Sequence, residues 1–255
     1  STNYHLAESG IQRWIQQKVH LPIEKKVVST ASAITTAAPS FGKEVSELLG
    51  GRKVDVIYNG FFEEKFEVLK DIAPKPKFTL AHAGTIYPYQ KVETLINGLR
   101  ILLKEKSEME LELIFYGLNF QPDQLRRVKE VSNGLPIRFV NRMPHDKLLE
   151  ELAACNVMLL LATPTKHQIY AKVFDYLALG KPVLLVENDH GPLEEMLLDH
   201  DSGQLCSNAK DVASALYKLY LNKDNAEAKE ADPRFSRKHQ AGVLSTIIHS
   251  VLDGS

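Results

Sequence analysis

The chain has 255 residues, of which 44% are hydrophobic and 25% charged, and its formal net charge is −1. This balance is ordinary for a globular protein and gives no reason to expect nucleic acid as a partner. No apolar run approaches the roughly 20 residues that a membrane-spanning helix needs, and no signal peptide is recognisable. Cys155 and Cys206 lie in apolar surroundings without CxxC spacing, so we expect reduced structural thiols and a cytoplasmic protein.

The first part of the chain predicts only a few short elements. Residues 11–28 carry apolar side chains at roughly helical spacing, with a kink expected at Pro22. A strand, a helix and a second strand are expected over residues 31–37, 41–49 and 54–58. The charged segment 63–77 reads as a connector. These strands are too few for a complete sheet.

From Phe78 onward the pattern is a regular alternation of strands and helices. Strands are expected over residues 78–83, 111–116, 137–140, 157–161 and 183–186. Helices are expected over residues 92–104, 121–132, 147–154, 169–179, 192–198, 211–221 and 235–252. This alternation predicts an α/β fold with a doubly wound, Rossmann-like parallel sheet covered on both faces. Ligands of such sheets bind at the carboxyl ends of the strands.

The segment 163–182 joins two buried strands through a polar loop and a short helix that ends at Gly180. The free N–H groups and the dipole of a helix N-terminus favour an anion such as phosphate. His167 lies in this loop, and Asp175 follows Lys172 by three positions on the helix. Lys172 and Asp175 either form an ordinary helix-surface ion pair, or Asp175 accepts two ribose hydroxyls as acids do in dinucleotide folds. We favour the second interpretation, because cations and an acid converge on one loop.

The ends of the other strands offer further candidates. Gly84 permits close approach to the backbone, Thr85 supplies a hydroxyl, and Lys91 can neutralise a phosphate; the alternative is a turn glycine and a solvated lysine. Gly117 again follows a strand directly, which is also what a simple turn requires. Arg142 can stack on a base or reach a phosphate, or be a surface arginine.

Motifs of metal and cofactor chemistry are missing from the sequence. The nine histidines show no paired ligand spacing, and HExxH, GxSxG, Walker and GxGxxG patterns do not occur. We therefore expect no metal and no cofactor.

Six segments of the chain resemble, in order, the C-terminal, donor-binding half of a retaining GT-B glycosyltransferase of the family 4-like kind (glycosyl transferases group 1). They are VIYNGF (56–61), LAHAGTIYPYQKVETLINGL (80–99), LIFYG (113–117), the segment 137–162, YAKVFDYLALGKPVLL (170–185) and FSRKHQ (235–240). The resemblance implies that residues 1–70 are a C-terminal remnant of the acceptor domain plus a linker. Residues 71–255 would form the Rossmann-like domain that binds a nucleotide-sugar donor.

The resemblance also implies roles for individual residues. Asp175 falls where the family's second glutamate binds the ribose hydroxyls. Lys91 falls on the basic residue that contacts the donor diphosphate, and Lys172 on a lysine common in relatives with a similar helix. These cations would stabilise the leaving diphosphate, which makes a metal unnecessary.

Gly84 corresponds to the glycine at which the donor approaches the backbone, and the loop with Arg142 and Met143 to the one that reads the base. Two residues depart from the family pattern. His167 stands where the first glutamate of the family's E-x7-E pair faces the donor sugar. Thr85 replaces the usual arginine after the glycine. These departures bear on donor identity and on activity.

The implied function is transfer of a sugar from a UDP- or GDP-sugar to a glycan or lipid-linked acceptor in surface polysaccharide synthesis, with the isolated fragment inactive and no catalytic residue assigned. Alternatives are a non-catalytic nucleotide-binding or interaction module, and a GT-B-like nucleotide-sugar epimerase. We further expect peripheral membrane contact through a missing part of the acceptor domain. Residues 1–60 should leave apolar surface uncovered, notably at Trp14 and Ile15, and offer a surface for self-association.

Overall fold

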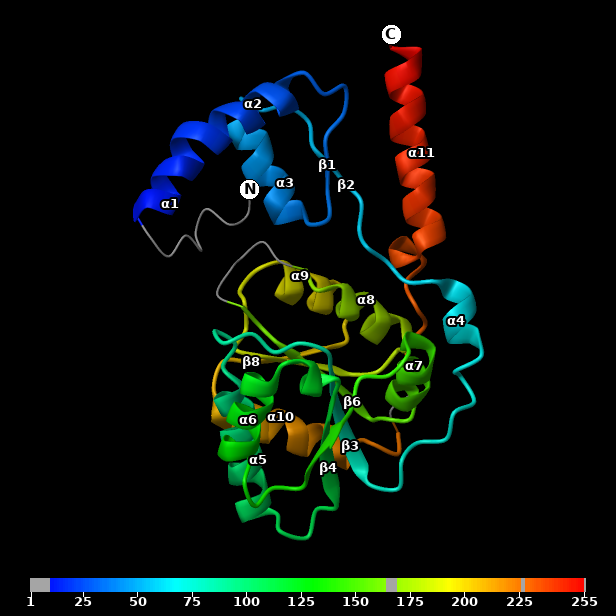
Figure 1. Cartoon of the computed structure of the whole chain (residues 1–255). Helices are drawn as coiled ribbons and strands as arrows, with labels where there is room; N and C mark the ends of the chain where they lie inside the picture. The colour runs from blue at the N-terminus through cyan, green and yellow to red at the C-terminus, as the bar shows by residue number, and fades with distance from the viewer. Residues whose placement is uncertain (1–9, 164–168, 226–227, 255) are drawn as a thin grey trace. The chain divides into compact units, whose positions relative to one another are not determined.

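A computed structural model describes residues 10–163, 169–225 and 228–254 (Figure 1). The chain forms two compact units, one of residues 1–58 with 241–255 and one of residues 59–240. The sequence predicted a division at residue 70, whereas residues 59–70 belong to the larger unit. There Phe61 and Phe66 are buried, and their rings meet edge to face at 5.5 Å between centroids.

The larger unit contains a six-stranded sheet with the order β5-β4-β3-β6-β7-β8. All neighbouring strands pair in parallel. The strands are β3 (Phe78–Ala83), β4 (Leu111–Tyr116), β5 (Ile137–Val140), β6 (Val157–Leu161), β7 (Val183–Val186) and β8 (Gly203–Cys206). The chain runs outward from β3 to β5, returns to β6 beside β3, and runs outward again to β8. The predicted doubly wound, Rossmann-like fold is confirmed; only the edge strand β8 was not expected.

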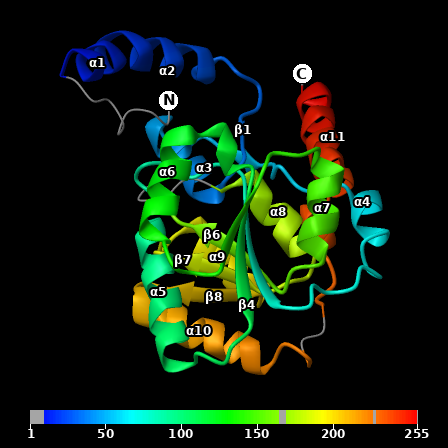
Figure 2. The same ribbon diagram turned by 60° about the horizontal axis from the view of Figure 1, so that its bottom comes forward.

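Helices cover both faces of this sheet. Figures 1 and 2 show α5, α6 and α10 on one side and α7, α8 and α9 on the other. Their bounds are α5 (Val92–Glu105), α6 (Pro122–Val131), α7 (His145–Ala153), α8 (Ala171–Ala178), α9 (Pro192–Asp199) and α10 (Ala209–Leu221). Shorter helices are α4 (Glu63–Glu67), η3 (Leu118–Phe120) and η4 (Pro233–Phe235). α4 lies in the segment that the sequence analysis took for a connector.

The core lies between the sheet and its helices. Every residue of β3, β6 and β7 is buried, because strands covered on both faces present neither side to water. α5 packs against α10 at Gly98, where an added Cβ would collide with Val212. Cys155 and Cys206 are buried and free, as predicted, and burial raises the pKa of the Cys155 thiol to about 11.

The smaller unit holds short elements and a two-stranded parallel sheet. They are α1 (Gly10–Ile15), the π-helix η2 (Gln16–His20), α2 (Leu21–Ser29), β1 (Thr35–Thr36), α3 (Pro39–Leu48) and β2 (Asp55–Val56). The last helix, α11 (Arg237–Asp253), begins in the larger unit. The expected interruption at Pro22 is a π-helical turn directly before it, because proline has no N–H to continue the hydrogen-bond ladder.

Apolar side chains of the first helices remain uncovered, as predicted. Trp14 is 60% and Ile15 38% exposed, and Ile23 and Val27 are exposed as well. Self-association through this surface stays a prediction. Among the described residues, no helix has the length and apolar character to cross a bilayer.

Candidate functional site

The strand order reverses between β3 and β6, which lie side by side while their outgoing connections lead in opposite directions. Such a switch point leaves a crevice outside the carboxyl ends of the two strands, and ligands of doubly wound sheets bind there. In this chain the 84–91 loop, which joins β3 to α5, and the N-terminus of α8 lie at that edge. Gly84, Thr85 and Lys91 lie in the loop, and Lys172 and Asp175 lie on α8.

The N-terminal part of α8 is bonded directly to the end of β3. Lys172 Nζ donates a hydrogen bond to the Ala83 carbonyl at 2.7 Å, and the Ala83 N–H donates to the Tyr176 hydroxyl at 3.0 Å. Lys172 and Tyr176 are one helical turn apart, so one face of α8 holds both backbone polar groups of Ala83. These two hydrogen bonds fix α8 against Ala83, the last residue of β3, which directly precedes Gly84.

Lys172 also lies beside a buried histidine, His82 of β3. Its Nζ is 3.2 Å from His82 Nε2, and within the described residues His82 Nδ1 has no hydrogen-bond partner. Burial lowers the pKa of Lys172 to about 7. Burial and, secondarily, the neighbouring ammonium hold the pKa of His82 well below its usual value. At neutral pH, His82 is therefore uncharged and Lys172 only partly protonated, which makes Lys172 a weaker cation than its predicted contact with a diphosphate assumes.

Gly84 presents an open backbone at the start of the 84–91 loop. Its φ of +85° lies in the left-handed region that favours glycine, and an added Cβ would meet no atom within 4 Å. Its N–H donates to the Tyr116 carbonyl at 2.8 Å, which fixes the turn. Thr85 follows, half-buried. A ligand group can approach the backbone here without displacing a side chain.

Gln90 connects the 84–91 loop to the rest of the site. It is 2% exposed, and its Nε2 donates to the Leu161 carbonyl at the end of β6 at 2.5 Å and to the Tyr170 hydroxyl at 3.1 Å. Its Oε1 accepts from the Tyr87 N–H at 2.8 Å. Gln90 thus joins the end of β6, the residue before α8 and the loop itself. No local pattern in the sequence indicates this role.

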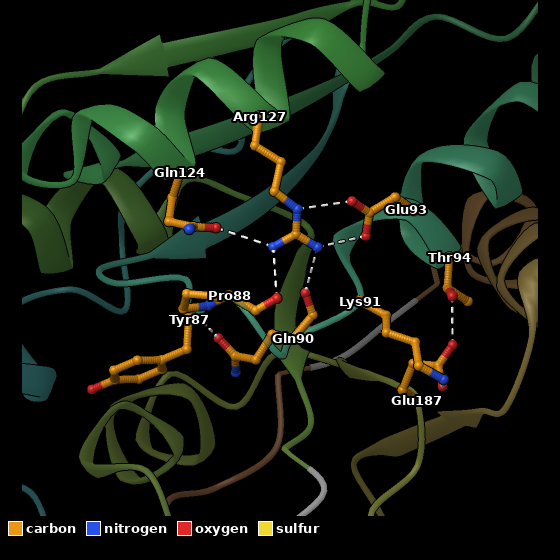
Figure 3. A network of polar contacts seen from close by, with 9 residues as sticks. All are labelled: Tyr87, Pro88, Gln90, Lys91, Glu93, Thr94, Gln124, Arg127 and Glu187. Carbon is orange, nitrogen blue, oxygen red and sulfur yellow. Dashed lines mark hydrogen bonds and ion pairs between the residues drawn. The ribbon is translucent and has the colours of Figure 1, made fainter. Parts of the chain in front are cut away.

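Lys91 ends the loop and contacts an acid from the other side of β6 (Figure 3). Its Nζ lies 3.1 Å from Glu187 Oε2, and Glu187 Oε1 accepts from the Thr94 hydroxyl at 2.5 Å. Glu187 has a φ of 58°, a strained conformation for a residue with a Cβ and one that is common at functional sites. Glu187 was not among the predicted site residues, although an acid directly after a buried strand is a recognisable signal.

Asp175 pairs with His145, the first residue of α7, and Lys172 bonds to Ala83, so the two side chains do not form the alternative helix-surface ion pair. His145 Nε2 lies 3.0 Å from Asp175 Oδ2. Burial raises the pKa of Asp175, and the hydrogen bond from His145 opposes that shift. The partner of Asp175 therefore lies at the start of α7, directly after the loop that was predicted to read a base.

The loops after β4 and β5 meet at Gly117 and Arg142. The Arg142 guanidinium lies 5.0 Å from the Phe120 ring centroid, and the Arg142 N–H donates to Asn119 Oδ1 at 2.8 Å. Gly117 has a φ of +80°, and its Cβ would lie 3.8 Å from the backbone of Arg142. Met143 follows, half-buried. Arg142 thus stacks on an exposed aromatic ring rather than pointing alone into solvent.

The predicted residues make separate contacts at this edge of the sheet and do not form one cluster. Gly84 adjoins the Lys172 contact, Asp175 lies with His145, and Lys91 lies with Glu187. His167 and the rest of residues 164–168, which belong to the polar loop that was predicted to bind an anion, lie outside the described residues. Within the part of the chain that is described, no three His, Cys, Asp or Glu side chains are grouped as metal ligands.

Comparison with known proteins identifies relatives by structure alone. No family model matches the chain, and no curated protein matches its sequence. Sucrose-phosphate synthase from Thermosynechococcus elongatus superposes on all of this chain with a TM-score of 0.71 at 15% identity. Anabaena HepE in complex with UDP and glucose superposes on 90% of it with a TM-score of 0.64 at 16% identity. A glycosyltransferase from Rickettsia africae superposes on 91% with a TM-score of 0.70 at 14% identity.

These structures establish what the fold is. The chain shares the GT-B fold with them, so the expected likeness to the C-terminal half of that fold is confirmed. The chain spans 66% of the length of the first two structures and 67% of the third.

Proposed function

We propose that the chain is the donor-binding portion of a retaining GT-B glycosyltransferase that uses a UDP- or GDP-sugar. The observation that carries the proposal is that an open glycine backbone at Gly84, a cation at Lys91 and an acid at Asp175 all follow the carboxyl ends of the two switch-point strands, although each makes its own contact. Structural relatives support it, since Anabaena HepE was crystallised with UDP and with UDP-glucose.

In this proposal each group acts on a different part of the donor. Lys91 exchanges its ion pair with Glu187 for the donor diphosphate, whose approach the bare backbone of Gly84 permits. Asp175 accepts hydrogen bonds from the ribose hydroxyls. Transfer in such a site relies on positioning and on stabilising the charge that develops on the leaving diphosphate, and Lys91 is the exposed cation suited to that task.

The acceptor belongs to the same proposal. On the family resemblance, it is a glycan or a lipid-linked glycan of surface polysaccharide synthesis. The acceptor-binding part, with any membrane contact, would come from a longer protein of which this chain is the donor side. Transfer activity is then a property of that protein rather than of the chain alone.

Titration calorimetry of the chain against UDP, GDP, ADP and CMP tests the proposal. One nucleoside diphosphate should bind with a submillimolar Kd, and its affinity should fall as salt rises, because Lys91 is exposed and its charge is screened. If none of the four nucleotides binds below millimolar concentration, the donor-site assignment is wrong.

A second candidate function is non-catalytic nucleotide binding. The observation that favours it is that Lys91 is already paired with Glu187 while burial reduces the charge of Lys172, which leaves little cationic charge for a leaving group. Nucleotide binding by the full-length protein, with neither transfer nor hydrolysis of any nucleotide sugar, would favour this candidate. Turnover of a nucleotide sugar would exclude it.

A further inference from the structure

Arg127 of α6 makes the densest set of polar contacts near the candidate site (Figure 3). Its Nε and Nη2 donate to the two carboxylate oxygens of Glu93 at 2.8 and 2.7 Å. Nη2 also donates to the Gln90 carbonyl at 3.0 Å. Nη1 donates to the Pro88 carbonyl at 3.2 Å and to Gln124 Oε1 at 3.0 Å. Every N–H donor of the guanidinium is thus used.

Two of these acceptors are backbone carbonyls of the 84–91 loop. Within the loop, the Gln90 N–H donates to the Tyr87 carbonyl and the Gln90 carbonyl accepts from the Val92 N–H, at 3.0 Å each. Side-chain donors from outside the loop add to these bonds. Arg127 supplies partners for Pro88 and Gln90. Gln121, at the start of α6, accepts the Ile86 N–H through its Oε1 at 3.1 Å. One helix therefore holds the loop near both of its ends.

The contacts of Arg127 lie on both sides of Lys91 in the chain. The Gln90 carbonyl directly precedes Lys91, and the Glu93 carboxylate follows two positions later. The direction in which Lys91 leaves the backbone depends on both neighbours. A bidentate arginine–carboxylate pair is directional as well as charged, and the side chains of Arg127 and Glu93 are 26% and 41% exposed. This pair fixes geometry more than it adds surface charge.

We propose that Arg127 is a positioning residue of the donor site: it fixes the backbone on both sides of Lys91, so that the Lys91 ammonium is held where a nucleoside diphosphate binds. The inference rests on the proposed function, since it assigns Arg127 to the same site. Arg127 itself does not contact the donor. It acts through the Pro88 and Gln90 carbonyls and through Glu93.

The test compares Arg127→Ala and Arg127→Lys with Arg126→Ala, a matched control on the same helix. Arg126 is 71% exposed and pairs with Asp123, three positions away on the same helix, so its loss should leave binding unchanged. The probes are UDP, measured by calorimetry, and uridine, measured by NMR titration; GDP and guanosine replace them if the chain prefers guanine. Thermal unfolding reports whether each variant is folded.

Both Arg127 variants should weaken UDP binding about tenfold and leave uridine binding unchanged, because only the diphosphate uses Lys91. Arg127→Lys keeps the charge but not the planar fork, so it remains informative if Arg127→Ala does not fold. In a Lys91→Ala background, Arg127→Lys should cause little further loss of UDP affinity, since coupled residues are not additive.

Other results would overturn the inference. Unchanged UDP affinity in a folded Arg127→Lys variant would show that Lys91 does not depend on Arg127. An equal loss of UDP and uridine affinity, or a full tenfold loss on top of Lys91→Ala, would show a general structural role instead. If the unmodified chain binds no nucleoside diphosphate, the proposed function itself fails, and the positioning role falls with it.

Discussion

Lys91 and Lys172 lie at the same edge of the sheet in opposite surroundings. Lys91 is 68% exposed and pairs with Glu187, whereas the ammonium of Lys172 is buried against the Ala83 carbonyl beside His82. Water and a carboxylate both favour a charged lysine, while burial without a carboxylate favours the neutral form. Two lysines that look alike in the sequence therefore have different tasks: Lys91 is suited to an anionic ligand, and Lys172 to fixing α8.

The largest expected effect concerns stability and pH. The pKa of Lys172 in the folded chain is about 7, below its unfolded value, so the unfolded chain binds more protons between about pH 7 and pH 10.4. As pH rises through that window, Lys172 should therefore increase the free energy of unfolding by up to about 1.4 kcal/mol per pH unit. Urea unfolding of Lys172→Met should lack this gain, while the matched variant Lys91→Met keeps it. The same pH dependence of the free energy of unfolding in both variants would show that the two lysines do not differ in this way.

The next effect concerns the diphosphate. Lys91→Met should weaken UDP binding by roughly 1.5–3 kcal/mol, the cost of losing a hydrogen bond to a charged group, and should reduce its salt dependence. Lys172→Met should reduce the affinity by less and change the salt dependence less, because the amine of Lys172 is only partly protonated near pH 7 and is already bonded to the Ala83 carbonyl. Calorimetry at two salt concentrations measures both quantities. A larger loss from Lys172→Met would reverse the assignment of tasks.

Asp175→Ala tests the proposed contact with the nucleoside part of the ligand. Loss of charge-assisted hydrogen bonds to ribose should weaken nucleotide binding by roughly 1–3 kcal/mol. Asp123→Ala is a suitable control, since Asp123 is 85% exposed on α6. Unchanged affinity in Asp175→Ala would leave this carboxylate with a structural role as the partner of His145.

The smallest effect concerns Glu187. Glu187→Gln removes the anion that competes with a diphosphate for Lys91, so the binding free energy of UDP should become more favourable by about 0.2–1 kcal/mol, the usual range for an exposed ion pair. The carboxamide can still accept from the Thr94 hydroxyl, which limits any structural change. A decrease in affinity would mean that Glu187 holds Lys91 in place rather than competing for it.

Much of the fold was predictable because buried parallel strands are local patterns. The five expected strands from Phe78 to Val186 match the observed ones residue for residue, since each is a mostly apolar run with a glycine or polar boundary, and β6 and β7 are apolar throughout. β8 was missed because Gly203–Cys206 has no such run. It is a strand only through its pairing with β7.

From the sequence alone follow the order of the elements, the edge of the sheet at which doubly wound folds bind ligands, and the turn glycines Gly84 and Gly117, whose φ values are positive in the structure. These depend on neighbouring residues along the chain. The tertiary structure decided the partners: Lys91 with Glu187, Asp175 with His145, and Arg127 with the 84–91 loop. These partners are at least 30 positions apart, and the charge of a side chain depends on which groups the folded chain brings to it.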